Sequence, residues 1–210
     1  MSPKIVDRKD KKRSIVLGAM RAFVSKGYHA TKMEDIALEA GIGKGTIYEY
    51  FRKKEDLALA LQAFIFENFN EVIRSVILSR KDGRGVQTLI DCMDAILKEV
   101  PHYVGIVPVF LEISSSRALN ESIGFRRQVG DWFTRMSQEF VSLIERGKCE
   151  GSVPQEIDAK AFSRMMISCL DGFSLHMNLL SQPKPFLKRQ MKEFKRMILT
   201  ALSPMDRERK

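Results

Sequence analysis

The chain of 210 residues has little cysteine: its three thiols are Cys92, Cys149 and Cys169. Three widely spaced cysteines cannot form a disulfide framework of the usual paired kind, and their scarcity indicates a reducing compartment. They also lack the close spacing that holds a structural zinc ion. We therefore expect a cytoplasmic chain without disulfides and without a metal site.

Long apolar runs are missing as well. No stretch approaches the roughly 18 consecutive apolar residues of a membrane-spanning helix, and the N-terminal segment lacks the apolar core of a signal peptide. The three histidines are dispersed, and the sequence contains neither a nucleophile elbow nor a phosphate-binding loop. We expect a soluble protein without membrane contact that is not an enzyme and needs no cofactor.

Positive charge is concentrated near the N-terminus. Lys and Arg outnumber Asp and Glu by 35 to 26, and residues 1–54 hold 13 of the basic and 6 of the acidic side chains. This distribution favours an anionic partner for the first quarter of the chain. The densest basic run comprises Arg8, Lys9, Lys11, Lys12 and Arg13. It is either a solvated helix start or, beside a DNA-reading unit, a set of phosphate contacts.

Helical periodicity dominates the sequence. Apolar residues recur at the three- and four-residue spacing of amphipathic helices, and no alternating strand pattern of useful length is present. We predict an all-α fold of about nine helices, including single helices over about 57–79 and 119–146. Near the N-terminus, Thr31 and Glu34 have the spacing of a capping box, which would open a short helix that Gly41 ends.

A further short helix is predicted from Lys44 to Tyr50, with Ile47 facing inward. At 100° per residue, Gly45 and Glu49 then face outward, with Thr46 and Tyr48 beside them. This outer face is nearly free of bulky apolar groups. Two short helices that meet at a glycine turn, the second with a small and hydroxylated outer face, suggest a helix offered to DNA.

These residues resemble the N-terminal helix-turn-helix of the TetR family of transcriptional regulators. The matching positions are Thr31, Ile36, Ala37, Ala40, Gly41, Gly45, Thr46, Ile47, Tyr48, Tyr50, Phe51, Lys54, Glu55 and Leu57. Gly43 departs from the family, since many relatives have serine there. The resemblance implies a three-helix DNA-binding head over residues 1–54 and a six-helix body for ligand binding and dimerisation over residues 55–210.

The resemblance also implies which residues contact double-stranded operator DNA. The expected contacts are Thr31, Lys44, Gly45, Thr46, Tyr48, Glu49, Tyr50 and Lys54. From their positions we place Lys44, Gly45 and Thr46 near base edges, because a recognition helix presents its N-terminal end to the bases. Tyr48, Tyr50 and Lys54 are placed on the phosphate backbone. Glu49 either accepts a hydrogen bond from a cytosine amino group or is a solvated charge at the groove edge.

Residues 55–210 are rich in large, adaptable apolar side chains. They contain 11 of the 13 phenylalanines, the single tryptophan and 8 of the 11 methionines, which suit either an ordinary core or a ligand cavity. The family resemblance implies a small hydrophobic or aromatic effector. The candidate lining residues are Phe66, Phe69, Met93, Tyr103, Phe110, Trp132, Met136, Met166 and Phe173. Four polar residues lie in otherwise apolar helical stretches: Glu112, His102, His176 and Asn178. Each either orients an effector or is satisfied by a neighbouring group.

The last two predicted helices have apolar faces wider than one neighbour needs, and the resemblance implies that they pair across a two-fold axis. We expect a homodimer that buries parts of 159–180 and 187–202 and binds a palindromic operator. The resulting hypothesis is a repressor that an effector releases from DNA. The alternative is a DNA-bound scaffold, or a regulator controlled by a protein partner, with no small-molecule ligand.

Overall fold

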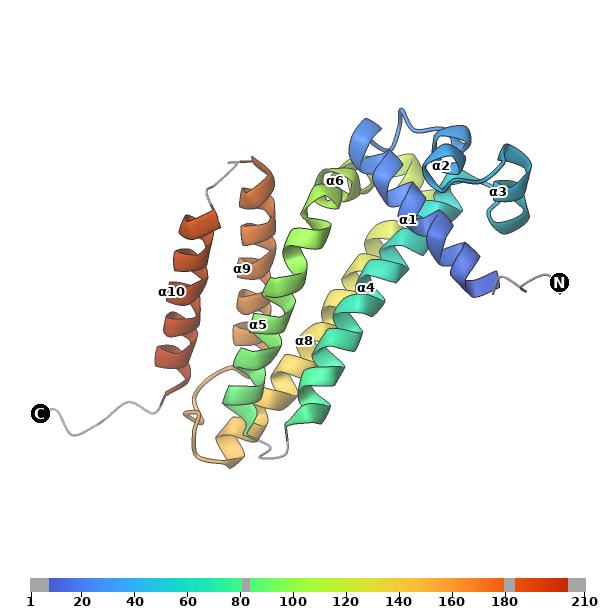
Figure 1. The fold of residues 1–210 in the computed structure, drawn as a ribbon. Coiled ribbons are helices and arrows are strands. Elements are labelled where there is room, and N and C mark those ends of the chain that lie inside the picture. The colour runs from blue at the N-terminus through green and yellow to red at the C-terminus, as the bar shows by residue number, and fades with distance from the viewer. Residues whose placement is uncertain (1–7, 81–83, 180–183, 204–210) are drawn as a thin grey trace, which may run out of the picture. The chain divides into compact units, whose positions relative to one another are not determined.

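The computed structural model describes residues 8–80, 84–179 and 184–203, and every regular element in these ranges is a helix. The predicted all-α fold is confirmed. The elements are α1 (Arg8–Lys26), α2 (Met33–Glu39), α3 (Lys44–Tyr50), α4 (Lys54–Ser79), α5 (Gly85–Tyr103), the 3-10 turn η1 (Val104–Ile106), α6 (Val107–Ser115), α7 (Arg117–Ile123), α8 (Phe125–Cys149), α9 (Ala159–Leu179) and α10 (Lys184–Leu202) (Figure 1). Within the described ranges, no helix combines the length and apolar character that crossing a membrane requires.

The helices form two compact units. Unit 1 comprises residues 1–68 and 105–129, and unit 2 comprises residues 69–104 and 130–210. The chain therefore passes between the units three times, within α4, within η1 and within α8. The division at residue 54 that the sequence suggested follows the DNA-reading motif instead, and it stays a prediction.

In unit 1, α1, α2 and α3 pack around a small apolar core. Ile15, Phe23, Ile36 and Ile47 are fully buried there, each on the inward face of its helix. Gly18 lets α1 and α2 approach closely, because a Cβ at this position would lie 2.8 Å from the Cβ of Ala40. Close helix packing at this point therefore requires glycine.

The start of α2 differs from the prediction. Its cap is Lys32, whose backbone N–H donates to Oδ2 of Asp35 at 2.8 Å, so the predicted capping box of Thr31 and Glu34 is wrong. The hydroxyl of Thr31 instead donates to the carbonyl oxygen of Gly27 at 2.6 Å. Gly27, in the left-handed region at φ 78°, ends α1, so the threonine closes the loop that follows.

The helix predicted over 119–146 is also interrupted. Gly124 adopts φ 63° and ends α7, and a new helix, α8, begins at Phe125. A left-handed glycine is the common way to end a helix, because it carries no Cβ to clash. The break adds one helix to the six expected after residue 54.

In unit 2, α5, α8, α9 and α10 pack side by side (Figure 1). Ser137 on α8 and Ser163 on α9 share a buried hydrogen bond of 2.8 Å between their hydroxyls. The rings of Phe173 on α9 and Phe194 on α10 lie 5.3 Å apart. Asp158 caps the start of α9, because its Oδ1 accepts from the N–H groups of Lys160 and Ala161 at 3.0 Å.

Candidate nucleic-acid interface

The short helix α3 is anchored by one side chain and presents the others to solvent. Ile47 is fully buried, whereas Lys44, Gly45, Tyr48 and Glu49 are exposed. Thr46 and Tyr50 are half-buried on the flanks of the same surface. These six predicted contacts thus share one accessible face, although their contact with DNA remains a prediction.

At Gly45 no side chain projects from the surface of α3. A Cβ built there would meet no described atom within 4 Å, so packing inside the chain does not require glycine at this position. The absence of a side chain leaves room at this position for a molecule that approaches from outside. Close approach of another molecule's surface is one standard reason for a glycine in a helix.

Lys44 forms an ion pair that no sequence pattern indicated. Its Nζ lies 2.6 Å from Oε1 of Glu34 on α2, and both side chains are largely exposed. Hydrogen bonding and attraction between the two groups lower the pKa of Glu34 and raise that of Lys44. Because solvent screens the attraction between two exposed groups, Lys44 can leave Glu34 for a base or phosphate at small cost.

Thr31 and Lys54, both predicted to contact DNA, make hydrogen bonds within the chain, and their contact with DNA remains a prediction. The side chain of Thr31 is buried and its hydroxyl is used within the chain. Nζ of Lys54 donates to the carbonyl oxygens of Tyr28, His29 and Thr31 at 2.7, 3.1 and 2.8 Å. Three acceptors occupy the three N–H donors of an ammonium group. Both side chains therefore hold the loop between α1 and α2 in the DNA-free chain.

Glu112 on α6 accepts hydrogen bonds from backbone N–H groups of the same loop. One carboxylate oxygen accepts from the N–H of Tyr28 at 2.8 Å and the other from the N–H of His29 at 2.9 Å. Burial alone would raise the pKa of Glu112, but these two hydrogen bonds outweigh it and lower the pKa. Of the two roles considered for Glu112, the structure supports a residue satisfied by its neighbours.

The loop from Gly27 to Thr31 is thus held by opposite charges. The ammonium of Lys54 donates to carbonyl oxygens of the loop, and the carboxylate of Glu112 accepts from its N–H groups. The ammonium also lies 4.5 Å from the ring centroid of Tyr28, which is buried beneath it. Because this loop joins α1 to α2, the two charged side chains fix the position of the helix-turn-helix within unit 1.

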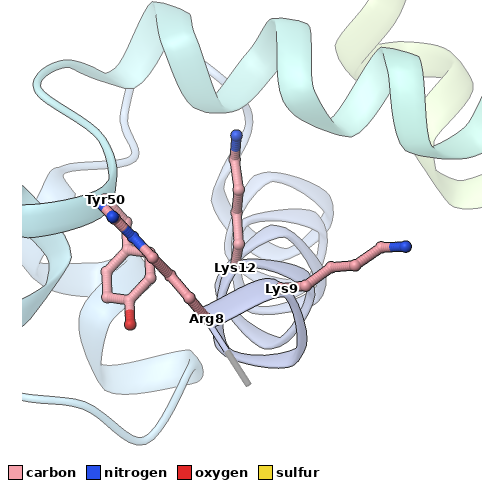
Figure 2. A pocket seen from close by; sticks show the side chains of 4 residues that line it. All are labelled: Arg8, Lys9, Lys12 and Tyr50. Carbon is pink, nitrogen blue, oxygen red and sulfur yellow. The ribbon is translucent and has the colours of Figure 1, made fainter. Parts of the chain in front are cut away.

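A basic cleft lies at the other end of α1. It is defined by Arg8, Lys9 and Lys12 on the first turns of α1 and by Tyr50, the last residue of α3 (Figure 2). Its volume is about 480 Å³. Figure 2 shows Arg8 beside the ring of Tyr50. The guanidinium carbon of Arg8 lies 6.0 Å from the centroid of that ring. The basic run in the sequence pointed to this surface, but Tyr50 as its wall had no sequence signal.

The candidate effector residues are only partly brought together. In unit 2 the ring of Phe69 lies 5.6 Å from that of Tyr103 and 6.0 Å from that of Trp132, and Trp132 donates to Asn70 at 2.9 Å. In unit 1 Phe66 and Phe110 form a separate pair with ring centroids 6.4 Å apart. Phe173 contacts Phe194 instead, and the three methionines are buried: Met93, Met136 and Met166. Their role in binding an effector remains a prediction.

The remaining polar candidates for orienting an effector are Asn178, His102 and His176. Asn178 donates to the carbonyl oxygens of Val104 at 2.6 Å and Ser174 at 3.2 Å, so its amide group is satisfied within unit 2. His102 and His176 are exposed. Exposed imidazoles are poorly placed to orient a ligand inside a helical core.

The helix-turn-helix segment matches a known protein family. The model of the family described as "Bacterial regulatory proteins, tetR family" matches residues 15–61, which span most of α1, all of α2 and α3 and the start of α4. The HTH-type transcriptional activator FasR of Mycolicibacterium smegmatis is 30% identical over 95 residues, 45% of this chain and 42% of that protein. The chain thus matches less than half of FasR.

Two other similar proteins extend the likeness beyond the motif. The fatty acid metabolism regulator protein of Bacillus subtilis is 23% identical over 164 residues, which cover 78% of this chain and 81% of that one. The crystal structure of a TetR transcription regulator from Haloarcula marismortui superposes with a TM-score of 0.75 at 20% identity, covering 93% of this chain and 100% of the other. This second likeness shows the fold. The helix-turn-helix segment, residues 15–61, therefore belongs to the TetR family of bacterial regulatory proteins, and the whole chain has the fold of a TetR transcription regulator.

Proposed function

We propose that the protein binds a palindromic operator in double-stranded DNA in the cytoplasm and reads it with α3. The observation that carries this proposal is the face of α3: buried Ile47 anchors the helix, while Gly45, Thr46 and Tyr48 form a low, hydroxylated surface. A helix of this kind in the major groove places its N-terminal residues at base edges and its flanking hydroxyls on phosphates.

The direct test is selection of random duplexes by the full chain, followed by sequencing. The proposal predicts enrichment of a sequence with inverted repeats. A Tyr48→Ala variant should bind selected and unrelated duplexes more weakly by a similar factor, because phosphate contacts carry no sequence information. Failure of the wild-type chain to enrich any duplex over an unselected pool would contradict the proposal.

We further propose that α9 and α10 form the homodimer interface. Several large apolar side chains on these helices are exposed, including Met165 at 53%, Leu179 at 68% and Met197 at 65%. Apolar groups gathered on one helical surface favour contact with another protein. A second copy is the natural occupant, because a palindromic operator requires two reading heads.

Light scattering at micromolar concentration tests the dimer. The wild-type chain should have the mass of two chains, and Met197→Asp should shift it to one. Leu78 on α4 offers a matched control, since it is 75% exposed and Leu78→Asp also places a charge on an exposed apolar position. A monomeric wild-type chain, or equal effects of the two substitutions, would contradict this interface.

For regulation, we propose a small hydrophobic effector that releases the protein from its operator, as in a repressor. The aromatic cluster of Phe69, Tyr103 and Trp132 supports a body that accepts apolar groups. A relative named as a fatty acid metabolism regulator supports an acyl chain as the effector class. An effector shifts the equilibrium only by its differential affinity for the two states, and operator DNA must weaken effector binding by the same factor.

Trp132 is the single tryptophan of the chain, so its fluorescence reports on this cluster alone. Titration with long-chain fatty acids should change that fluorescence and weaken operator binding over the same concentration range. A fluorescence change with unaltered operator affinity would contradict the proposed release. If fatty acids, their thioesters and aromatic compounds all leave both signals unchanged, the alternative of a regulator controlled by a protein partner is favoured.

A further inference from the structure

Lys44 and Glu34 bring opposite charges together at the start of α3. Glu34 lies in the first turn of α2 and Lys44 is the first residue of α3, and Nζ of the lysine lies 2.6 Å from Oε1 of the glutamate. The side chain of Lys44 is 65% exposed and that of Glu34 is 48% exposed. Both groups are therefore accessible together to a molecule that approaches the start of α3.

The neighbours of Lys44 in the sequence leave this pair unobstructed. Gly43 and Gly45 carry no side chains, and a Cβ at Gly45 would meet no described atom within 4 Å. A backbone without side chains permits close approach of another surface. A partner can therefore come near to the ammonium of Lys44 and to the carboxylate beside it.

The pair keeps hydrogen-bonding capacity on both sides. An ammonium has three N–H donors and a carboxylate accepts about four hydrogen bonds, so a contact between the two leaves donors and acceptors for a ligand. The hydrogen bond from Lys44 lowers the pKa of Glu34, which keeps the carboxylate ionised and purely an acceptor at neutral pH. The pair thus presents a donor and an acceptor side by side.

A guanine–cytosine base pair presents the complementary arrangement in the major groove. O6 and N7 of guanine are acceptors, and the N4 amino group of cytosine is a donor. Guanine O6 and cytosine N4 are hydrogen-bonded to each other, so they lie about 2.9 Å apart, close to the 2.6 Å between Nζ of Lys44 and Oε1 of Glu34. Thymine has a methyl group beside its O4, so a lysine finds one acceptor there instead of two.

The carboxylate also disfavours a phosphate as the partner of Lys44. If Lys44 bound a backbone phosphate, Glu34 would lie close to the same negative charge and would be repelled by it. At a cytosine the carboxylate instead accepts an N–H group, and the pair need not separate. The arrangement therefore favours base edges over the phosphate backbone.

We propose that Lys44 and Glu34 together read one guanine–cytosine base pair in each half of the operator. Lys44 donates to O6 and N7 of the guanine, and Glu34 accepts from N4 of the cytosine. The inference rests on the proposed DNA-binding function. It adds Glu34 of α2 to the predicted contacts and assigns the identity of one base pair in each half-site.

Selection of random duplexes by the full-length variants Lys44→Ala and Glu34→Ala tests the proposal. The wild-type chain should enrich G·C at one symmetry-related pair of positions, and each variant should lose this preference while keeping the rest of the palindrome. In anisotropy titrations, changing these positions to A·T should weaken wild-type binding about tenfold or more and leave binding by the two variants nearly unchanged. Circular dichroism melting checks that each variant folds.

Glu39→Ala is the matched control. Glu39 is also an exposed glutamate of α2, but it pairs with Arg21 on α1 at 3.2 Å. Loss of this negative charge should strengthen binding to every duplex slightly and leave the G·C preference intact. The same base preference in Glu34→Ala and the control would overturn the role of Glu34, whereas a wild-type chain that enriches no duplex would overturn the proposed DNA-binding function itself.

Modified bases test the two sets of hydrogen bonds separately. 7-Deazaguanine lacks the N7 acceptor, and N4-methylcytosine keeps the pairing hydrogen but replaces the groove-facing one by a methyl group. Either base at the assigned position should weaken wild-type binding about fivefold or more. Lys44→Ala should be insensitive to the first and Glu34→Ala to the second. Equal sensitivity of the wild type and the corresponding variant to either base would overturn the contact assigned to that residue.

Discussion

Replacing Glu112 by glutamine should loosen the loop that joins α1 to α2. The carboxylate accepts N–H groups from Tyr28 and His29 at 2.8 and 2.9 Å, one on each oxygen. Glutamine retains one acceptor and turns an NH2 group towards the other N–H. Hydrogen bonds to a charged group contribute about 1.5–3 kcal/mol, and the lower end applies here because the side chain is 30% exposed.

We therefore expect Glu112→Gln to lower the free energy of unfolding by about 1.5–2 kcal/mol, which corresponds to a fall in Tm of about 3–8 °C for a chain of this size. The effect should depend on pH. Because the folded-state pKa of Glu112 lies below its ordinary value, its stabilisation is fully present above about pH 5 and is lost as the pH falls through the folded pKa.

Thermal melts followed by circular dichroism between about pH 3 and pH 8 measure this difference. Glu71→Gln on α4 is the control, because Glu71 is an exposed glutamate elsewhere in the chain. The wild-type and Glu112→Gln curves should converge at acid pH, while the control should follow the wild type throughout. A Glu112→Gln melt that matches the control at neutral pH, or a difference that persists unchanged at acid pH, would refute the role assigned to the carboxylate.

Three further predictions concern single positions. Gly45→Ala should leave Tm equal or higher, since its methyl group meets no described atom within 4 Å, yet weaken operator binding in a mobility-shift titration; unchanged affinity would contradict close approach of DNA. Lys54→Met should destabilise the fold by about 1–3 kcal/mol but keep the salt slope of DNA binding, because its three N–H donors are used within the chain; a slope lower by one unit would instead identify Lys54 as a phosphate contact. Burial raises the pKa of Cys92 to about 12, so at pH 8 a thiol reagent should modify exposed Cys149 and reach Cys92 only after unfolding; rapid reaction of Cys92 in the native chain would contradict its burial.

The parts of the structure that follow from local pattern were predictable from the sequence. The helix around Ile47 and its outward face rest on a 100° repeat that the structure reproduces, with Ile47 buried and Gly45 exposed. The ends of α1 and α2 follow from Gly27 and Gly41, both of which adopt positive φ. At these sites the local preference and the tertiary packing agree.

Side-chain partners that depend on tertiary contacts were predicted wrongly from the sequence or could not be predicted. Thr31 has the chemistry of a helix cap, but its hydroxyl bonds to Gly27 because the loop folds back on α1. Glu112 lies 84 residues from Tyr28, so no local pattern linked them. The only signal was a carboxylate among apolar residues of a helix, which requires donors from somewhere. Gly124 was a usable signal that the periodicity of its neighbours concealed.

Reading of base sequence by α3 is measured by the ratio of affinities for the selected palindrome and a scrambled duplex. The ratio should be measured at one salt concentration for the wild-type chain and for a Lys44→Ala/Thr46→Ala variant. If α3 reads the bases, the ratio is large for the wild type and falls towards one in the variant, mainly through weaker binding of the palindrome. An unchanged ratio in a folded variant would contradict the claim.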